Sequence, residues 1–301
     1  MAVGVMDSDR QVHYEGHESS VGRTEDQLVE DLAREIGEAR EARPDAVAAG
    51  LGIPCTIDRE RGIAIAGVNL PITDVPIRDL MTERLGMPVF IDNDANCAAL
   101  AEHRFGASRG AENAVLLTVG TGIGGGLIIG GELYRGSTGA GAELGHMVIQ
   151  LEGPKCQGAC PSYGCAEVLA SGTALGRYGA EAAERYPDSA LGKALAAGTE
   201  FNGRIVVEAA QAGDQAAVGV LEHVGRHLGA HLTGLANAFD PDVIVIGGGV
   251  SAAGDLLLGP AREELSKRAL PPMNKVEVVR AELGPAAGMI GAATMALEES
   301  A

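Results

Sequence analysis

The chain has 301 residues, of which 46% are hydrophobic and 21% charged, a balance typical of one or two globular domains and unlike that of a disordered chain. Its 23 basic and 41 acidic residues leave a net charge of −18, and tryptophan is absent, so a nucleic acid would find neither a basic surface nor a stacking platform. No uninterrupted run of 18 apolar residues and no basic leader occur, which predicts a soluble, cytoplasmic protein without a membrane partner.

The first hundred residues alternate between short apolar runs and amphipathic stretches. A helix is predicted over residues 24–42, where Leu28, Leu32 and Ile36 recur at helical spacing. The other elements expected in this part are strands at 2–6, 12–17, 46–51 and 88–91 and helices at 78–85 and 96–105.

The rest of the chain repeats the alternation. It begins with two strands around a glycine-rich turn and ends with an alanine- and methionine-rich helix. The expected elements are strands at 114–119, 125–129, 243–246 and 276–279 and helices at 216–238, after the glycines at 247–249, and at 286–297. This order predicts two α/β lobes, residues 1–108 and 109–301, with a cleft between them and the last helix packing back on the first lobe.

Two glycine clusters indicate a nucleotide. In the first, Gly120, Gly122 and Gly124 would let backbone N–H groups approach phosphate oxygens, and Thr121 adds a hydroxyl; a hairpin with a glycine bulge is the alternative. The second cluster, Gly247, Gly248 and Gly249, follows a buried strand and precedes a helix, where phosphate can bind; a tight strand-to-helix turn is the alternative. Together they favour a nucleotide site.

An acidic segment ends the apolar strand near residue 90. Asp94 lies just before a predicted helix, where an aspartate is commonly an N-cap. At the mouth of a cleft it could instead accept the proton of a hydroxyl that attacks phosphorus, with Asn93 holding the same hydroxyl. Asn69, Glu143 and Glu167 are further candidates for a polyol site, if the fold brings them together.

One histidine and three cysteines have the composition of a metal site. His146, Cys156, Cys160 and Cys165 offer one nitrogen and three sulfur ligands, which suits a closed, tetrahedral, structural Zn²⁺ site; reduced, unliganded cysteines are the alternative. A second set, at positions 223, 227 and 231, shares one face of a helix. No acidic or thiol ligand joins these histidines locally, so a polar or interlobe face is expected there.

These elements, in this order, resemble the ROK family of sugar kinases and repressors, most closely its members that phosphorylate glucose. The resemblance covers nearly the whole chain and rests on Gly67-Val-Asn-Leu-Pro71, Ile91-Asp-Asn-Asp-Ala-Asn96, the loop from Thr118 to Gly126, Gly141-Ala-Glu-Leu-Gly-His146, Gly164-Cys-Ala-Glu167 and Val245-Ile-Gly-Gly-Gly249. It implies an actin-like (ribonuclease H-like) two-lobe α/β fold that closes on a sugar and ATP, and a homodimer.

The resemblance also implies roles for the candidate residues. Asp94 would be the general base toward the 6-hydroxyl of glucose in an ATP- and Mg²⁺-dependent phosphoryl transfer. Thr121 and the glycines beside it would face phosphate, and the second glycine cluster would lie near the adenosine. The sugar would be bound by Asn69, Asn93, Asp94, Glu143, His146 and Glu167, with His146 also ligating zinc.

Two departures from the family pattern stand out. The first two cysteines of the metal loop are separated by three residues, where the family commonly has one. The family's opening strand and Asp-x-Gly-Gly-Thr phosphate turn have no counterpart from Met1 onward, so we expect a wrong start or a fragment. Loss of a central strand would leave unpaired backbone groups on its neighbours, each costing about 1–3 kcal/mol if buried.

Other functions remain open at this point. They are a kinase for another hexose or N-acetylmannosamine, a kinase that uses polyphosphate in place of ATP, and an inactive sugar-binding remnant without the phosphate turn. A DNA-binding regulator is disfavoured because no helix-turn-helix segment is present and the net charge opposes DNA.

Overall fold

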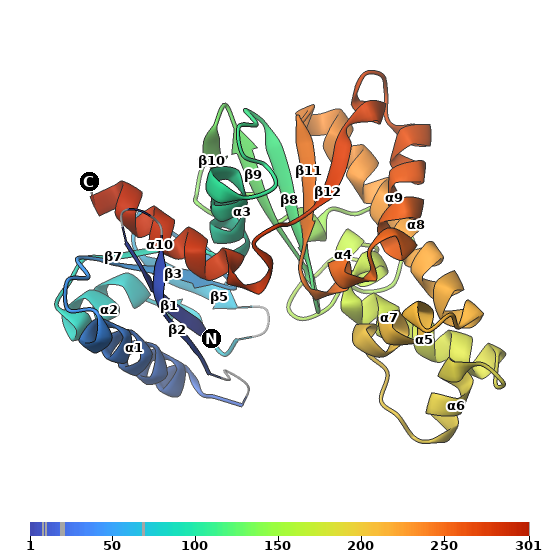
Figure 1. Ribbon diagram of the computed structural model, residues 1–301, viewed down its shortest axis with the longest axis horizontal. Helices are drawn as coiled ribbons and strands as arrows, with labels where there is room; N and C mark the ends of the chain where they lie inside the picture. The colour runs from blue at the N-terminus through green and yellow to red at the C-terminus, as the bar shows by residue number, and fades with distance from the viewer. Residues whose placement is uncertain (8, 10, 19–21, 68–69, 301) are drawn as a thin grey trace.

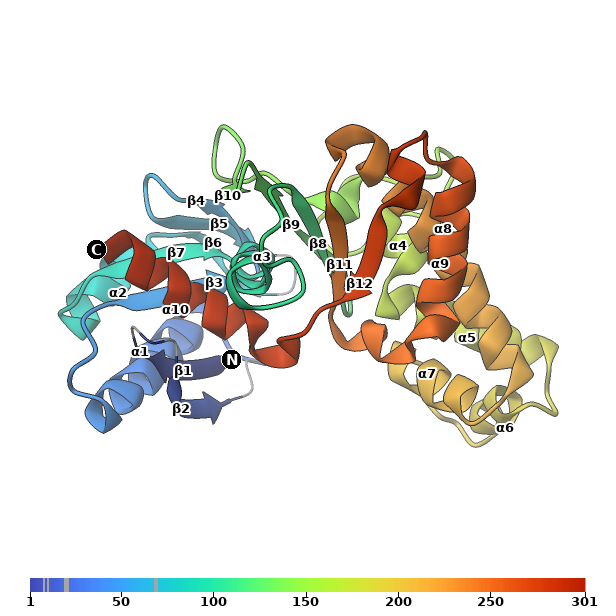
Figure 2. The same ribbon diagram turned by 45° about the horizontal axis from the view of Figure 1, so that its top comes forward.

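The computed structural model describes residues 1–7, 9, 11–18, 22–67 and 70–300. They form two α/β lobes, with the N-terminal strands and helices on one side and a five-stranded sheet with its helices on the other (Figures 1 and 2). In this described part of the chain, no helix is both long enough and apolar enough to cross a bilayer.

The sheet of the large lobe has the strand order β10-β9-β8-β11-β12. β8 pairs antiparallel with β9 and parallel with β11, and β11 is buried along its whole length because helices cover both faces. The strands are β8 (Ala114–Val119), β9 (Ile123–Ile129), β10 (Glu132–Tyr134), β11 (Val243–Gly247) and β12 (Glu277–Arg280).

Alternate residues of β8 point into two cores. Val115, Leu117 and Val119 pack against the helices of the large lobe, whereas Ala114 and Leu116 face a second core beneath α3 and α10. The helices on the first side are α4 (Ala166–Ala170), α5 (Gly172–Arg185), α6 (Ala190–Ala196), α7 (Gly203–Gln211), α8 (Gln215–Phe239) and α9 (Asp255–Arg268). Four short 3-10 helices complete this part: η1 (Leu144–His146), η2 (Gly249–Ala253), η3 (Met273–Lys275) and η4 (Gly284–Ala286).

The three histidines of α8 all belong to the large lobe, but His223 is exposed, His227 is half-buried and His231 is buried, so the expected polar or interlobe face is found, as a polar face, only at the first two. The ring of His223 meets that of Tyr178 edge-on, with centroids 4.6 Å apart, and His227 stacks on the same tyrosine. His231 is fully buried, and neither of its ring nitrogens has a hydrogen-bond partner. The three residues follow the curve of the helix from its surface into the core.

In the described residues of the small lobe, the strands form three separate sheets. β1 (Ala2–Met6) and β2 (Val12–His17) form a hairpin, β3 (Ala49–Ile53) pairs in parallel with β7 (Val89–Asn93), and the third sheet is a meander. Its strands are β4 (Cys55–Asp58), β5 (Ile63–Gly67) and β6 (Thr73–Val75), and the helices of this lobe are α1 (Glu25–Ala42) and α2 (Ile77–Leu85). β3 begins three residues later than the predicted strand, and the sequence analysis missed the meander.

Two helices join the lobes. α3 (Asp94–Phe105) packs against β9, and α10 (Ala287–Ser300) returns from the large lobe to lie on α3 and β3 (Figure 1). A side chain at Gly50 or Gly291 would collide with the backbone of the facing helix, so glycine at both positions allows this close approach.

Glu102 fastens both points where the chain crosses between the lobes. Its side chain is fully buried on α3, and its Oε2 accepts hydrogen bonds from the backbone N–H of Ala107 (2.8 Å) and Glu282 (3.1 Å). Oε1 accepts from Leu283 N–H at 2.8 Å. The residues after α3 and those before α10 are therefore held by one carboxylate.

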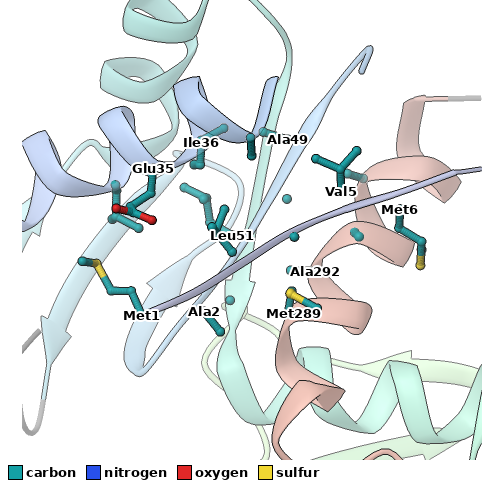
Figure 3. Close-up of a pocket in the computed structure, with 18 of the residues that line it drawn as sticks. Met1, Ala2, Val5, Met6, Glu35, Ile36, Ala49, Leu51, Met289 and Ala292 are labelled. Carbon is teal, nitrogen blue, oxygen red and sulfur yellow. The ribbon is translucent and has the colours of Figure 1, made fainter. Parts of the chain in front are cut away.

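A cavity of about 650 Å³ lies between β1, β3, α1 and α10. Val5, Leu51, Met289 and Ala292 are among the apolar residues that line it (Figure 3). Among the described residues, β1 hydrogen-bonds as a strand only to β2, and β3 only to β7. Each of the two strands thus keeps one edge without a partner strand.

Candidate active site

Asp94 stands where β7 meets α3. Asn93 caps the helix: its Oδ1 accepts hydrogen bonds from the backbone N–H of Ala95 (2.8 Å) and Asn96 (3.3 Å). The N-cap that the sequence suggested for Asp94 is therefore supplied by the preceding residue. Asp94 as a whole is an exposed residue, and its Oδ1 accepts from Ala95 N–H at 2.9 Å.

Surrounding protein atoms desolvate this carboxyl, and that desolvation raises the pKa of Asp94. The backbone N–H of Ala95 acts in the opposite direction and limits the rise. A carboxylate with a raised pKa is a stronger proton acceptor. Asp94 thus has the accessibility and the basicity that a general base needs.

Glu143 and Glu167 lie near Asp94 although more than 40 residues separate them from it in the chain. Desolvation raises the pKa of Glu143, nearby His146 lowers it, and the carboxylates of Asp94 and Glu167 raise it further. Glu167 is buried, and its Oε2 accepts a hydrogen bond from Ile123 N–H at 2.9 Å. Glu143 therefore lies close enough to both Asp94 and Glu167 for their charges to act on it.

The other predicted sugar-binding residues differ in availability. Asn93 already uses its Oδ1 as a cap and donates from Nδ2 to the Cys55 carbonyl at 3.2 Å, so one amide hydrogen is left for a ligand. His146 is half-buried in η1, three residues after Glu143. Asn69 lies outside the described residues.

The glycine-rich turn follows β8 and is fastened to the start of α5. Gly172 N–H donates to the Gly120 carbonyl at 2.7 Å, and the Thr173 hydroxyl donates to the Thr121 carbonyl at 2.8 Å. A side chain at Gly122 would collide with the Glu167 carboxylate, so this turn touches the acidic group directly.

Gly124 lies where β9 packs closely against its neighbours. A Cβ there would lie 3.0 Å from the Cβ of Ala95, so this glycine lets α3 approach β9. The open positions of the turn are Gly120, which has space around it, and Thr121, which is exposed.

The second glycine cluster lies beside the first. β8 and β11 are parallel, with Gly247 opposite Thr118, so both clusters sit at the carboxyl ends of neighbouring strands. Gly248 has φ 81°, and a side chain there would collide with the Val119 carbonyl oxygen. A short 3-10 helix, η2, begins at Gly249, and the predicted helix follows it as α9; Gly249 has open space around it.

The four predicted metal ligands converge. The ligand atoms of His146, Cys156, Cys160 and Cys165 all lie within 4.8 Å of one another. Cys156 Sγ is 3.6 Å from His146 Nδ1, and Cys160 Sγ is 4.0 Å from Cys165 Sγ. Tetrahedral Zn–S bonds of about 2.3 Å put neighbouring sulfurs about 3.8 Å apart, so the donor set fits Zn²⁺ in type and spacing.

The metal loop connects directly to the acidic residues. Cys165 precedes α4, which carries Glu167, and His146 ends η1, which follows Glu143. Gly164 has φ 65°, and a side chain there would collide with the Gln150 carbonyl oxygen, so glycine is needed to close the loop. The longer spacing between the first two cysteines does not prevent convergence.

Two residues at this site were missed by sequence reasoning. Asp92 is 2% exposed and pairs with Arg135, whose Nε lies 2.5 Å from Asp92 Oδ2. An acid at the end of an apolar strand was visible in the sequence, but its partner 43 residues later was not.

Comparison with known proteins agrees with this arrangement. Residues 1–299 match the model of the ROK family. The chain is 39% identical over 284 residues to a glucokinase of Thermotoga maritima, covering 91% of this chain and 89% of that protein. It is 37% identical over 304 residues to a glucokinase of Streptomyces coelicolor, covering 99% and 94%.

A solved structure is similar along the whole chain. It is the ROK family glucokinase of Streptomyces griseus in complex with glucose and AMPPNP, with a TM-score of 0.88, 35% identity, and coverage of 99% of this chain and 96% of that one. The two-lobe fold is that of actin-like sugar kinases. From its fold, and from a sequence match that spans nearly all of its residues, this chain belongs to the ROK family.

Proposed function

We propose that the protein transfers the γ-phosphoryl group of ATP to the 6-hydroxyl of glucose. The observation that carries the proposal is the convergence of an accessible, basic Asp94 with Glu143 and Glu167 beside the glycine-rich turn. Support comes from similarity over nearly the full chain to glucokinases, one of them solved with glucose and AMPPNP.

Asp94 acts as the general base in this proposal. Its carboxylate accepts the proton of the 6-hydroxyl while the hydroxyl oxygen forms a bond to the γ-phosphorus. The bond from that phosphorus to the bridging oxygen breaks in line, and ADP leaves with the electron pair. Mg²⁺ bound with ATP would neutralise charge on the phosphates.

The remaining side chains of the site position glucose. Glu143 and Glu167 would accept hydrogen bonds from sugar hydroxyls, and the free amide hydrogen of Asn93 would donate one. His146 would contact the sugar through the ring nitrogen that faces away from the cysteines, and Asn69 belongs to the same proposed set. Each ring hydroxyl both donates and accepts, so a mixed group of acids and amides suits a polyol.

ATP would lie along the two glycine clusters. Gly120 and Thr121, the open positions of the first turn, would face the phosphates together with the neighbouring Gly122 and Gly124. Gly247, Gly248 and Gly249 would border the adenosine. A structural Zn²⁺ held by His146 and the three cysteines would fix the segments that carry Glu143 and Glu167. The lobe division at residue 108, a homodimer and a location in the cytoplasm, where ATP is supplied, complete the proposal.

A coupled ADP-release assay tests the function. We expect glucose to support turnover with ATP better than fructose, mannose or N-acetylmannosamine, and better than polyphosphate does as donor. Asp94→Asn should abolish turnover while calorimetry still detects glucose binding. Asp79→Asn is the matched control because Asp79 also stands in the first turn of a helix, but on exposed α2.

Three results would contradict the proposal. They are turnover by Asp94→Asn, a different preferred hexose, and glucose binding by the unsubstituted protein without ADP release. The last result would identify a sugar-binding protein.

A further inference from the structure

We propose that the buried ion pair between Asp92 and Arg135 is a positioning device that holds the loop carrying Glu143 against the strand end carrying Asp94. The inference rests on the proposed function, because Glu143 and Asp94 matter as a pair only if both face one substrate. Neither Asp92 nor Arg135 needs to touch that substrate.

Asp92 fixes the start of α3. Its Oδ1 accepts hydrogen bonds from Asn93 N–H and from Asn96 Nδ2, both at 2.8 Å. Its Oδ2 accepts from Arg135 Nε at 2.5 Å. Asp94 therefore lies between two residues, Asn93 and Asn96, whose orientation depends on the Asp92 carboxylate.

Arg135 fixes the opposite side of the site. It follows β10, and its carbonyl accepts a hydrogen bond from Gly141 N–H at 2.8 Å, which closes residues 135–141 into a compact loop. A Cβ at Gly141 would lie 2.8 Å from the Arg135 carbonyl carbon, so the two ends of the loop are in close contact. Glu143 is only two residues beyond Gly141, so a shift of Arg135 would be passed on to Glu143 through a short segment of backbone.

The charges around the pair keep it in one geometry. A second guanidinium, that of Arg59, has its Nε 4.0 Å from Asp92 Oδ2, and Glu299 of α10 pairs with Arg59 and lies 3.9 Å from Arg135. The cluster holds two cations and two anions. Removing Arg135 would leave the nearly buried Asp92 carboxylate short of its closest cation, and such a charge draws in water or moves toward solvent.

The expected effect is on geometry at the sugar. A displacement of about 1 Å between substrate-positioning groups and the reacting atoms can cost about 10²-fold in rate. We therefore expect Arg135→Gln to lower kcat/KM for glucose by about 10²-fold. Part of this loss should be a higher KM, because in the proposed function Glu143 binds sugar hydroxyls in the ground state as well as in the transition state. The KM for ATP should not change, because the glycine clusters lie on other strands.

The experiment compares three substitutions. Arg135→Lys keeps the positive charge but lacks the planar fork, so it should restore part of the affinity for glucose. Arg104→Gln is the matched control: Arg104 is 22% exposed against 23% for Arg135, and it also joins two elements, through Glu298 at 2.8 Å, but away from the site. Arg135→Gln should lose more stability in urea than Arg104→Gln, because it leaves the buried Asp92 carboxylate without its closest cation, and only Arg135→Gln should weaken glucose binding.

A double-mutant cycle and a structure complete the test. If the pair acts as a unit, Asp92→Asn combined with Arg135→Gln should lose little more than either change alone. A crystal structure of Arg135→Gln should show the Glu143 loop displaced from the end of β7. Unchanged KM for glucose in Arg135→Gln, or an undisplaced loop, would overturn the proposal. If the unsubstituted protein turns over no hexose, the proposed function fails, and the loop position alone decides the positioning role.

Discussion

Glu102→Ala removes a buried carboxylate that accepts hydrogen bonds from three backbone N–H groups at the two lobe crossovers. Hydrogen bonds to charged groups contribute roughly 1.5–3 kcal/mol each, so three would sum to roughly 4.5–9 kcal/mol. The N–H groups are only partly buried and can regain water, so we expect the lower end, about 4.5 kcal/mol. That is a large fraction of a net stability of about 5–15 kcal/mol.

Glu102→Gln separates the hydrogen bonds from the volume of the side chain. With its amide oxygen in place of Oε2, glutamine keeps the bonds from Ala107 and Glu282, but its NH₂ group then opposes Leu283 N–H. We expect a loss of roughly 1.5–3 kcal/mol, between that of the alanine variant and none.

Urea unfolding followed by circular dichroism measures these losses. Glu298→Ala is the control because it removes an ion pair with Arg104 in which the glutamate is 42% exposed, and such pairs contribute at most about 1 kcal/mol. If Glu102→Ala loses no more free energy of unfolding than Glu298→Ala, the carboxylate does not fasten the crossovers and the reasoning fails.

Four further predictions concern the site and its supports. Because the folded-state pKa of Asp94 is raised, its ionised form destabilises the fold at neutral pH; Asp94→Asn should raise the melting temperature at pH 7, and this gain should vanish as the pH falls below that pKa. An unchanged melting temperature would contradict the sign. Chelation should remove one zinc ion per chain, free three thiols for titration and lower the melting temperature, whereas a full thiol titre before chelation would exclude the metal. Gly248→Ala should lower the free energy of unfolding in urea by at least about 1–3 kcal/mol and weaken ATP binding, because φ at this residue is positive and the added Cβ collides with a carbonyl oxygen. Gly249 stands in open space, so Gly249→Ala should lower the free energy of unfolding far less. Equal losses in the two variants would refute the contact. Burial lowers the pKa of His231 from 6.5 to about 4, so on acidification this histidine is protonated in the unfolded chain before it is protonated in the folded protein. The free energy of unfolding should therefore fall by about 3 kcal/mol between pH 7 and pH 4. His231→Leu should flatten this pH dependence.

Local patterns predicted many elements well. β8 and β1 coincide with the expected ranges, and Thr24 caps α1 as the start of the predicted helix suggested. No helix was predicted in the stretch from α4 to α7, although α5 and α7 are amphipathic and their sequences carry a helical periodicity. β3 was shifted because its two glycines interrupt the apolar run on which the prediction relied.

The candidate site was predictable in its parts and not in its assembly. The donor types of the metal cluster and the acid at Asp94 are local signals, and both pointed to chemistry before any fold was known. That Glu143 and Glu167 meet Asp94 depends on how β7, η1 and α4 come together, which only the resemblance supplied. Arg135 carries no local signal, because its partner is fixed by the tertiary structure alone.

The hollow beneath α10 also affects how this protein behaves at high concentration. In the described residues, β1 and β3 each have one edge whose backbone donors and acceptors face no partner strand, and the cavity between the two strands is lined largely by apolar residues. Natural proteins usually protect the unpaired edges of their sheets, because an exposed edge can pair with a strand from another molecule. Strand exchange between copies of the protein would therefore start in the N-terminal lobe. In hydrogen–deuterium exchange, the backbone amides at the unpaired edges of β1 and β3 should be among the fastest to exchange.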